Sequence, residues 1–126
     1  MTRKIWMNFF IMLLMIPLSA CQSGEYYQFQ TKPPSAEEAL ALDHDADLFQ
    51  WEGTVYQTNV DWTKELTLTK QQQVGVIKKT SSENFQHGTA SQLKKGVAIY
   101  AAKERNDVLI VEQNGQLKIY VALIEG

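Results

Sequence analysis

The sequence predicts a small α+β domain that is mainly β: a small antiparallel sheet or open barrel of five to six strands with one short N-terminal helix. Three observations favour this fold. Apolar and polar residues alternate along much of the chain after residue 48, which is typical of strands. Asn114–Gly115 separates two such runs and marks a hairpin. A helix-start pattern at Ser35 precedes all the expected strands.

The helix is expected over residues 36–42. Ser35 is a favourable N-cap, because its hydroxyl can accept a hydrogen bond from a free backbone N–H of the first turn. Glu38, three residues later, can complete a capping box. Glu37 and Glu38 also place negative charge at the positive end of the helix dipole.

The clearest strands lie in "VLIVEQNGQLKIYVALI", residues 108–124. With Asn114–Gly115 as a two-residue type I′ turn, this run folds into a hairpin. The expected cross-strand pairs are Gln113 with Gln116, Ile110 with Ile119, and Val108 with Val121. One face, which we expect to be the core face, then carries Val108, Ile110, Ile119 and Val121. The other face is only half apolar, and we expect it to be partly covered; it carries Leu109, Val111, Lys118 and Tyr120.

Shorter strands are expected between the helix and this hairpin. Residues 48–62 alternate loosely, with two expected faces: Phe49, Trp51 and Val55 on one, and Tyr56, Val60 and Trp62 on the other. Residues 65–69 alternate more cleanly, with Leu66 and Leu68 inward. Residues 71–73 ("QQQ") would connect to a strand in 74–80. Residues 80–92 are expected to be mostly loop, with Phe85 packed into the core, before a strand at 97–102.

Size and charge limit the function classes. The chain has 126 residues and a formal charge of −2, with Arg3 and Lys4 near its start. Without those two residues, ten basic and fourteen acidic residues remain. No basic stripe with interleaved aromatic residues is present, so nucleic acid is not an expected partner. A core-forming part of roughly 90 residues can fold alone but leaves little room for a deep active site.

The first 21 residues have the layout of a secretory signal peptide. Two positive charges in "MTRK" precede an unbroken apolar run, Phe9–Leu18, and then small residues. A permanent membrane-spanning helix needs about 20 predominantly apolar residues. This segment is shorter, and Pro17 would break its last turn. A retained transmembrane anchor is therefore the less favoured alternative.

The end of this segment, Leu18, Ser19, Ala20 and Cys21, resembles the lipobox of bacterial lipoproteins. The resemblance implies that a diacylglyceryl group is added to the Cys21 thiol and that the chain is cleaved between Ala20 and Cys21. Membrane lipid, through the acylated Cys21, is thus the first expected partner. Cys21 is the one cysteine of the chain, so an internal disulfide is excluded.

These patterns divide the chain into three parts. Residues 1–20 are expected to be a cleaved lipoprotein signal peptide. Residues 21–35 would form the lipidated cysteine and a partly ordered linker, since the Pro33–Pro34 pair prevents a helix through them. Residues 36–126 would form a single small β-rich domain.

Few residues suggest chemistry. Asp43, Asp45 and Asp47 have the spacing that opens an EF-hand loop, but Leu48 stands where that loop needs Gly, and we expect a solvated helix end instead. The two histidines, His44 and His87, are too few for a zinc site without added carboxylates. No nucleophile elbow or glycine-rich phosphate loop is present. We therefore expect no catalytic residue, no metal and no cofactor.

The aromatic residues after the helix leave two interpretations open. The tryptophans and tyrosines among them are Trp51, Tyr56, Trp62, Tyr100 and Tyr120. In a small sheet such residues usually build the core. Aromatic rings also anchor binding sites, because they bring a large contact area at a low entropic cost. On that second interpretation, Trp51, Tyr56 and Trp62 form a candidate binding surface.

The region after residue 46 resembles a group of short, uncharacterised lipoproteins of Bacillus-type Firmicutes. The shared elements are Gly53–Tyr56, Phe85–Ala90, Gly96–Tyr100, Asp107–Val111 and Glu125–Gly126. The resemblance implies an extracytoplasmic location on the outer face of the cell membrane, but no reaction. The leading hypothesis is a non-catalytic binding or interaction module with an envelope protein or ligand as partner. The alternatives are a small envelope hydrolase that uses His87 or acidic residues, and a structural or stress-related lipoprotein.

Overall fold

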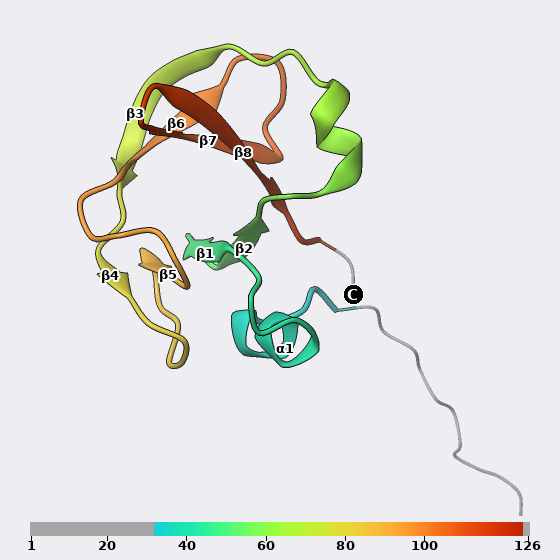
Figure 1. Cartoon of the computed structure of the whole chain (residues 1–126), viewed down its shortest axis with the longest axis vertical. Coiled ribbons are helices and arrows are strands. Elements are labelled where there is room, and N and C mark those ends of the chain that lie inside the picture. The colour runs from blue at the N-terminus through green and yellow to red at the C-terminus, as the bar shows by residue number, and fades with distance from the viewer. Residues whose placement is uncertain (1–31, 125–126) are drawn as a thin grey trace, which may run out of the picture. The chain divides into compact units, whose positions relative to one another are not determined.

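The structure, a computed structural model, describes residues 32–124, which belong to one compact unit, Thr31–Gly126 (Figure 1). In chain order its elements are α1 (Ala36–Leu42), β1 (Leu48–Trp51), β2 (Thr54–Gln57), the 3₁₀ helix η2 (Asp61–Glu65), β3 (Lys70–Val76), β4 (Lys79–Thr80), β5 (Thr89–Ala90), β6 (Ala98–Ala102), β7 (Val108–Gln113) and β8 (Gln116–Ala122). The mainly β class with one short N-terminal α-helix is confirmed within these residues. The expected leader and lipidation site lie outside them.

Helix α1 has the predicted bounds and the predicted cap. The Ser35 hydroxyl accepts a hydrogen bond from the Glu38 N–H at 3.0 Å, and the Glu38 carboxylate accepts one from the Ser35 N–H at 2.8 Å. The helix buries Ala36 and Ala39 against the sheet. No helix in residues 32–124 has the length and apolar character needed to cross a bilayer.

The strands form one mixed sheet in the order β3-β6-β7-β8-β2-β1-β5-β4. The prediction of five to six strands, all antiparallel, was wrong: the sheet has eight, and β4 pairs with β5 in parallel. The difference arises mainly from β4 and β5, which have two residues each. Strands this short carry no alternation that a sequence pattern can reveal.

The sheet is strongly curled because its two edge strands lie on one extended segment. β3 pairs with β6, and β4, reached through Ile77 and Lys78, pairs with β5 (Figure 1). The Ile77 N–H donates to the Val97 carbonyl at 2.9 Å, on the β6 side. The Lys78 N–H instead donates to the Gly88 carbonyl at 2.8 Å, on the β5 side. One segment thus links both ends of the sheet and wraps it around a common interior.

The turn between β1 and β2 reassigns the predicted faces. Glu52 and Gly53 both have left-handed backbone, with φ of 50° and 82°, as a type I′ turn requires. The chain therefore reverses, and Phe49 lies opposite Tyr56 on the same face. Val55 faces the other way, toward α1. Grouping Val55 with Phe49, and Tyr56 on the opposite face, was wrong because the alternation was read through a turn.

The chain leaves the sheet after β2, so the prediction that the alternating run continues to Val60 and Trp62 on the Tyr56 face was wrong. Asn59 has a φ of 66°, and η2 follows directly after Val60. Residues 66–69 alternate in burial as predicted, with Leu68 packed on the sheet, yet they join no strand ladder. The strand at 65–69 and the connector at 71–73 were therefore wrong predictions. An alternating pattern shows only that one side of a segment is covered. A loop that crosses the surface of a sheet has such a covered side without pairing as a strand.

The β7–β8 hairpin has the predicted turn and register. Asn114 and Gly115 have φ of 53° and 78°, and the pairs run from Gln113 with Gln116 to Val108 with Val121. On the expected core face, Val108, Ile110 and Val121 are buried, but the hairpin buries residues of its other face too. The opposite face enters the interior of the curled sheet, where Val111 and Tyr120 are fully buried.

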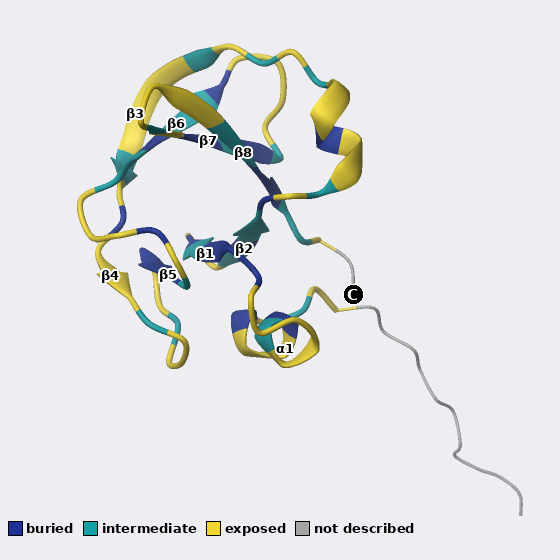
Figure 2. Ribbon diagram, in the orientation of Figure 1, coloured by how far each residue is buried: buried dark blue, intermediate teal, exposed yellow. Residues whose placement is uncertain are grey.

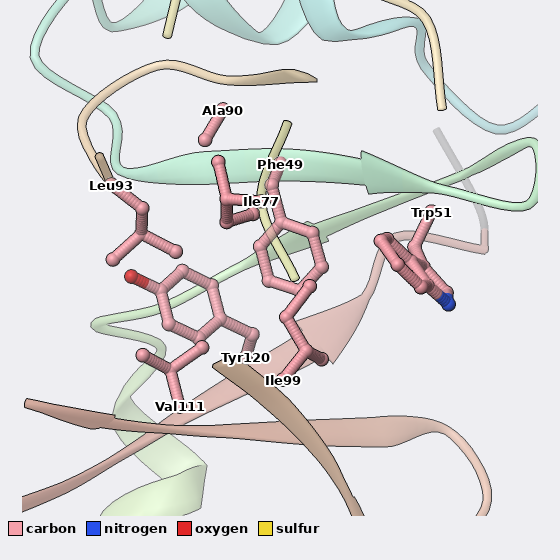
Figure 3. Packing of buried hydrophobic residues seen from close by; sticks show 8 residues of the cluster. All are labelled: Phe49, Trp51, Ile77, Ala90, Leu93, Ile99, Val111 and Tyr120. Carbon is pink, nitrogen blue, oxygen red and sulfur yellow. The ribbon is translucent and has the colours of Figure 1, made fainter. Parts of the chain in front are cut away.

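Three apolar clusters result, one inside the curl and two outside it. The inner cluster places the Phe49 and Tyr120 rings near its centre and Trp51 at one side (Figure 3). Its buried members are Phe49, Trp51, Ile77, Ala90, Leu93, Ile99, Val111 and Tyr120. One outer cluster lies under α1, and half-buried Phe85 packs there as expected. The other lies on β6 and β7 under Leu68. The side chains of η2 and β3 are largely exposed (Figure 2).

Candidate functional site

The predicted lipidation site lies outside the described residues. Leu18, Ser19, Ala20 and Cys21 therefore stay a prediction from the sequence. The candidate binding residues Trp51, Tyr56 and Trp62, by contrast, all fall in the described part of the chain.

The three candidate aromatic residues occupy different environments. Trp51 is 7% exposed and belongs to the inner cluster. Tyr56 is half-buried and stacks on Phe49, with ring centroids 5.5 Å apart. Burial, followed by the charges of Glu52 and Asp107, raises the pKa of Tyr56. Trp62, in η2, is 47% exposed. Of the three, Trp62 is thus the one that offers an open aromatic surface.

His87 and Ser91 have structural contacts that use their polar atoms. The His87 ring packs against Trp51 with centroids 4.1 Å apart, and its Nδ1 accepts a hydrogen bond from the Glu52 N–H at 3.0 Å. The Ser91 hydroxyl donates to the Ala46 carbonyl at 2.7 Å and accepts from the Leu48 N–H at 3.0 Å. These contacts join the residues on either side of β5 to β1 and the residues that flank it.

The acidic run after α1 divides into exposed and buried members. Asp43 and Asp45 are exposed, and the Asp43 carboxylate accepts a hydrogen bond from the Asp45 N–H at 3.0 Å. Asp47 is 6% exposed, so the expectation of a solvated helix end was wrong for it. Within residues 32–124, no group of three or more metal-ligating side chains comes together.

Asp47 is the centre of a buried polar network. Its carboxylate accepts hydrogen bonds from the Tyr120 hydroxyl at 2.9 Å and from Lys118 Nζ at 2.8 Å. Burial, and then the Asp47 charge, raises the pKa of Tyr120, so the phenol stays a donor. The two donors provide the buried carboxylate with hydrogen-bond partners. Because both donors belong to β8 and Asp47 directly precedes β1, the network joins these two strands.

An open cleft of about 910 Å³ lies where β6 passes into β7. Half of its ten lining residues form the charged turn "KERND" (103–107), which we call the rim, and the other half are apolar. It is lined by Ala101, Ala102, Lys103, Glu104, Arg105, Asn106, Asp107, Val108, Leu109 and Ile124. Among these, Ile124 is a large apolar side chain that is exposed.

A two-pronged ion pair shapes the rim. Arg105 donates from Nε and Nη2 to the two carboxylate oxygens of Asp107, each at 2.8 Å. Such paired bonds fix the orientation of both planar groups. The hydrogen bond from Arg105 holds the pKa of Asp107 below its ordinary value and raises that of Arg105.

A second set of bonds ties the same turn to the segment before β3. Glu104 accepts hydrogen bonds from the Thr69 N–H at 2.8 Å and from its hydroxyl at 2.7 Å, which lower the pKa of Glu104. The Lys103 N–H donates to the Thr69 carbonyl at 2.9 Å. On the other side, the Asp107 carbonyl accepts from the Ala122 N–H at 2.9 Å. The turn is therefore held from both sides.

Trp62 joins this rim through Arg105. The guanidinium carbon lies 5.0 Å from the centroid of the Trp62 ring, within the range of a cation–π contact. η2 thus places an exposed indole beside a fixed guanidinium–carboxylate pair. These three side chains, with the cleft next to them, form the candidate binding site.

The sequence identified Trp62 but not its neighbours. Arg105 and Asp107 stood in a segment expected only to turn the chain. The R-x-D spacing in a tight turn could have indicated a paired guanidinium and carboxylate. Nothing in the sequence indicated that Trp62 would meet them, because 43 positions separate it from Arg105.

The chain matches no protein-family model, and neither the curated proteins nor the solved structures contain one significantly similar to it.

Proposed function

We propose that this protein is an exported lipoprotein, held at the outer face of the cell membrane by an acylated Cys21. Residues 36–126 would act as a non-catalytic binding module for an envelope ligand or protein. The observation that carries the proposal is "LSAC" (18–21), directly after a positively charged start and a ten-residue apolar run. An ordinary signal peptide needs no cysteine at that place.

The physics of lipid anchoring agrees with this assignment. A single acyl chain binds membranes only marginally, whereas two chains give stable attachment, at about 0.8 kcal/mol per buried CH₂. A diacylglyceryl group provides both chains at one residue. The linker 21–35 would then separate the domain from the lipid surface.

The binding role is supported by the site at the turn between β6 and β7. An exposed indole, a fixed Arg105–Asp107 pair and an adjoining cleft meet there. The hydrolase alternative has weaker support, because His87 Nδ1 is already engaged by the Glu52 N–H and its ring by Trp51. Substituting His87→Ala and Asp43→Ala in the anchored protein tests that alternative, and loss of function with fold and anchoring intact would favour it.

Anchoring is tested by metabolic labelling with a fatty-acid analogue. We expect the wild-type protein and a Ser23→Ala control to be labelled and to fractionate with membranes. A Cys21→Ser variant should lose both the label and the membrane fraction. Equal labelling of Cys21→Ser and wild type would exclude the lipoprotein assignment.

A further inference from the structure

We infer that the cleft beside Trp62 binds an uncharged oligosaccharide, with the indole as a stacking platform and the Arg105–Asp107 pair as the hydrogen-bonding edge. This inference rests on the proposed function as a binding module and assigns its ligand class. The juxtaposition that carries it is an exposed aromatic ring, Trp62, in contact with a planar ion pair that lines a cleft; Trp62 is not itself a lining residue, and Arg105 connects it to the cleft.

The charge of the cleft favours a neutral ligand. Its lining contains two cationic side chains, Lys103 and Arg105, and two anionic ones, Glu104 and Asp107. Arg105 and Asp107 are joined by a salt bridge at 2.8 Å, and Glu104 is held by Thr69. A phosphate at Arg105, or an ammonium group at Asp107 or Glu104, would have to compete with these internal partners. A ligand with no net charge can bind without breaking them.

The pair retains hydrogen-bonding capacity of both kinds. A guanidinium has five N–H donors, and a carboxylate has about four lone-pair positions. The bonds between Arg105 and Asp107 use two of each. Asn106, also on the cleft, adds an amide with donors and an acceptor. A sugar hydroxyl both donates and accepts, so neighbouring hydroxyls suit an edge where fixed donors and acceptors alternate.

Trp62 supplies the apolar half of the site. A pyranose ring has a face of C–H groups, which packs favourably on a large aromatic surface. Trp62 is 47% exposed, and the Arg105 guanidinium lies over its ring, so a sugar would stack on the part of the indole that Arg105 leaves open. Leu109 and Ile124 are separate apolar side chains of the cleft lining. The site is thus amphipathic in the way that a sugar is.

The rim is ordered before any ligand arrives. Bonds from Thr69 and Ala122 hold the turn, and the paired bonds orient Arg105. Pre-ordered contacts lower the entropic cost of binding. The cleft volume of about 910 Å³ is near the upper end of the range of about 300–1,000 Å³ usual for small-molecule sites, which favours an oligosaccharide over a single sugar.

The test is a titration of the mature, lipidated protein in mild detergent with triacetylchitotriose and, separately, maltotriose. Binding is measured by isothermal titration calorimetry in every protein and, in those that retain Trp62, also by the NMR signal of its indole N–H. We expect a saturable shift with at least one trisaccharide. Trp62→Ala and Asp107→Asn should weaken binding by about tenfold or more. Trp62→Phe, which keeps an aromatic ring, should retain part of it. Leu117→Ala is the matched control, because Leu117 is 48% exposed at the far end of β8, and it should bind like wild type.

Two outcomes would overturn the inference. One is the absence of any shift with both trisaccharides; the other is inorganic phosphate shifting the same signal with equal or greater affinity. Circular dichroism of each variant checks that the fold persists. The anchoring proposal has its own readout in Cys21→Ser labelling, so the failure of sugar binding and the failure of the lipoprotein assignment are distinguishable.

Discussion

Two networks in this protein combine the same three kinds of side chain but differ in how deeply they are buried. In the first, Asp47 binds Lys118 and Tyr120, and the lysine ammonium lies 5.9 Å from the tyrosine ring centroid. In the second, Asp107 binds Arg105, whose guanidinium lies 5.0 Å from the Trp62 ring centroid. Each combines a carboxylate, a cation and an aromatic side chain.

Burial separates their roles. Asp47 and Tyr120 are 6% and 0% exposed, and they connect β1 to β8 in the interior. An unpaired polar group there would be costly, so each member holds the others in place. Trp62 is 47% exposed, and the Arg105–Asp107 pair beside it contributes little to stability because water screens it. The same chemistry therefore stabilises the fold at one site and is free to contact a ligand at the other.

The largest expected effect separates the two aromatic members. Tyr120→Ala should lower the free energy of unfolding by about 3–5 kcal/mol, because it leaves a cavity beside Phe49 and removes one of the two hydrogen bonds to the buried Asp47 carboxylate. Trp62→Ala should lower it by less than about 1 kcal/mol, since that ring is half exposed. Urea denaturation measures both values. Similar losses for the two variants would contradict the division into structural and surface networks.

The acidic members give the next contrast. Asp47→Asn should cost about 2 kcal/mol, because the amide keeps the Tyr120 contact but presents N–H groups or a neutral oxygen to Lys118, which is 37% exposed at its side chain. Asp107→Asn should change stability much less. Thermal unfolding monitored by circular dichroism is suitable for both. A smaller effect for Asp47→Asn than for Asp107→Asn would reverse the comparison.

Gly75 tests how tightly the interior is packed. A Cβ atom at this position would overlap the six-membered ring of Trp51. Gly75→Ala should therefore cost about 1–3 kcal/mol through overpacking. The double variant Gly75→Ala with Trp51→Phe should recover part of that loss, because the smaller ring leaves room. An unchanged unfolding midpoint for Gly75→Ala would show that the ring moves freely.

The smallest effect concerns pH. Arg105 lowers the pKa of Asp107 from its ordinary value of 3.8, so the folded state favours the ionised carboxylate. This stabilisation is fully present above the pKa of the unfolded chain and is lost as pH falls through the lower folded value. The stability difference between wild type and Asp107→Asn should therefore shrink as pH falls below about 4. A difference that grows on acidification would refute this pairing.

Local patterns predicted the elements whose signals lie within a few residues. Ser35 and Glu38 determine the start of α1, since both cap bonds form within four residues. Asn114–Gly115 determines the β7–β8 register, since few residue pairs adopt two left-handed conformations in succession. The Glu52–Gly53 turn has the same geometry, but glutamate is an uncommon residue there, so the face assignment that depended on it was wrong.

The candidate site could not be predicted in the same way. The sequence left Trp62 as either a core residue or part of a binding surface. It contains no local sign that Arg105 would lie beside it. The first part of β3 was missed as well: the predicted strand at 74–80 covers its end, but the glutamine-rich residues 70–73 pair with β6 despite mostly exposed side chains. Backbone pairing across the sheet, rather than side-chain pattern, makes that strand.

The sequence by itself determined the helix, the terminal hairpin and the mainly β class. It also predicts lipidation at Cys21. These depend on short-range capping, turn geometry and alternation, which few residues are enough to specify. Only the tertiary structure decided which aromatic residue is open, which aspartate is buried, and that η2 meets the turn between β6 and β7. Those outcomes depend on how the sheet curls, because burial and charge pairing between distant segments are set when the two ends of the sheet come together on the segment from β3 to β4.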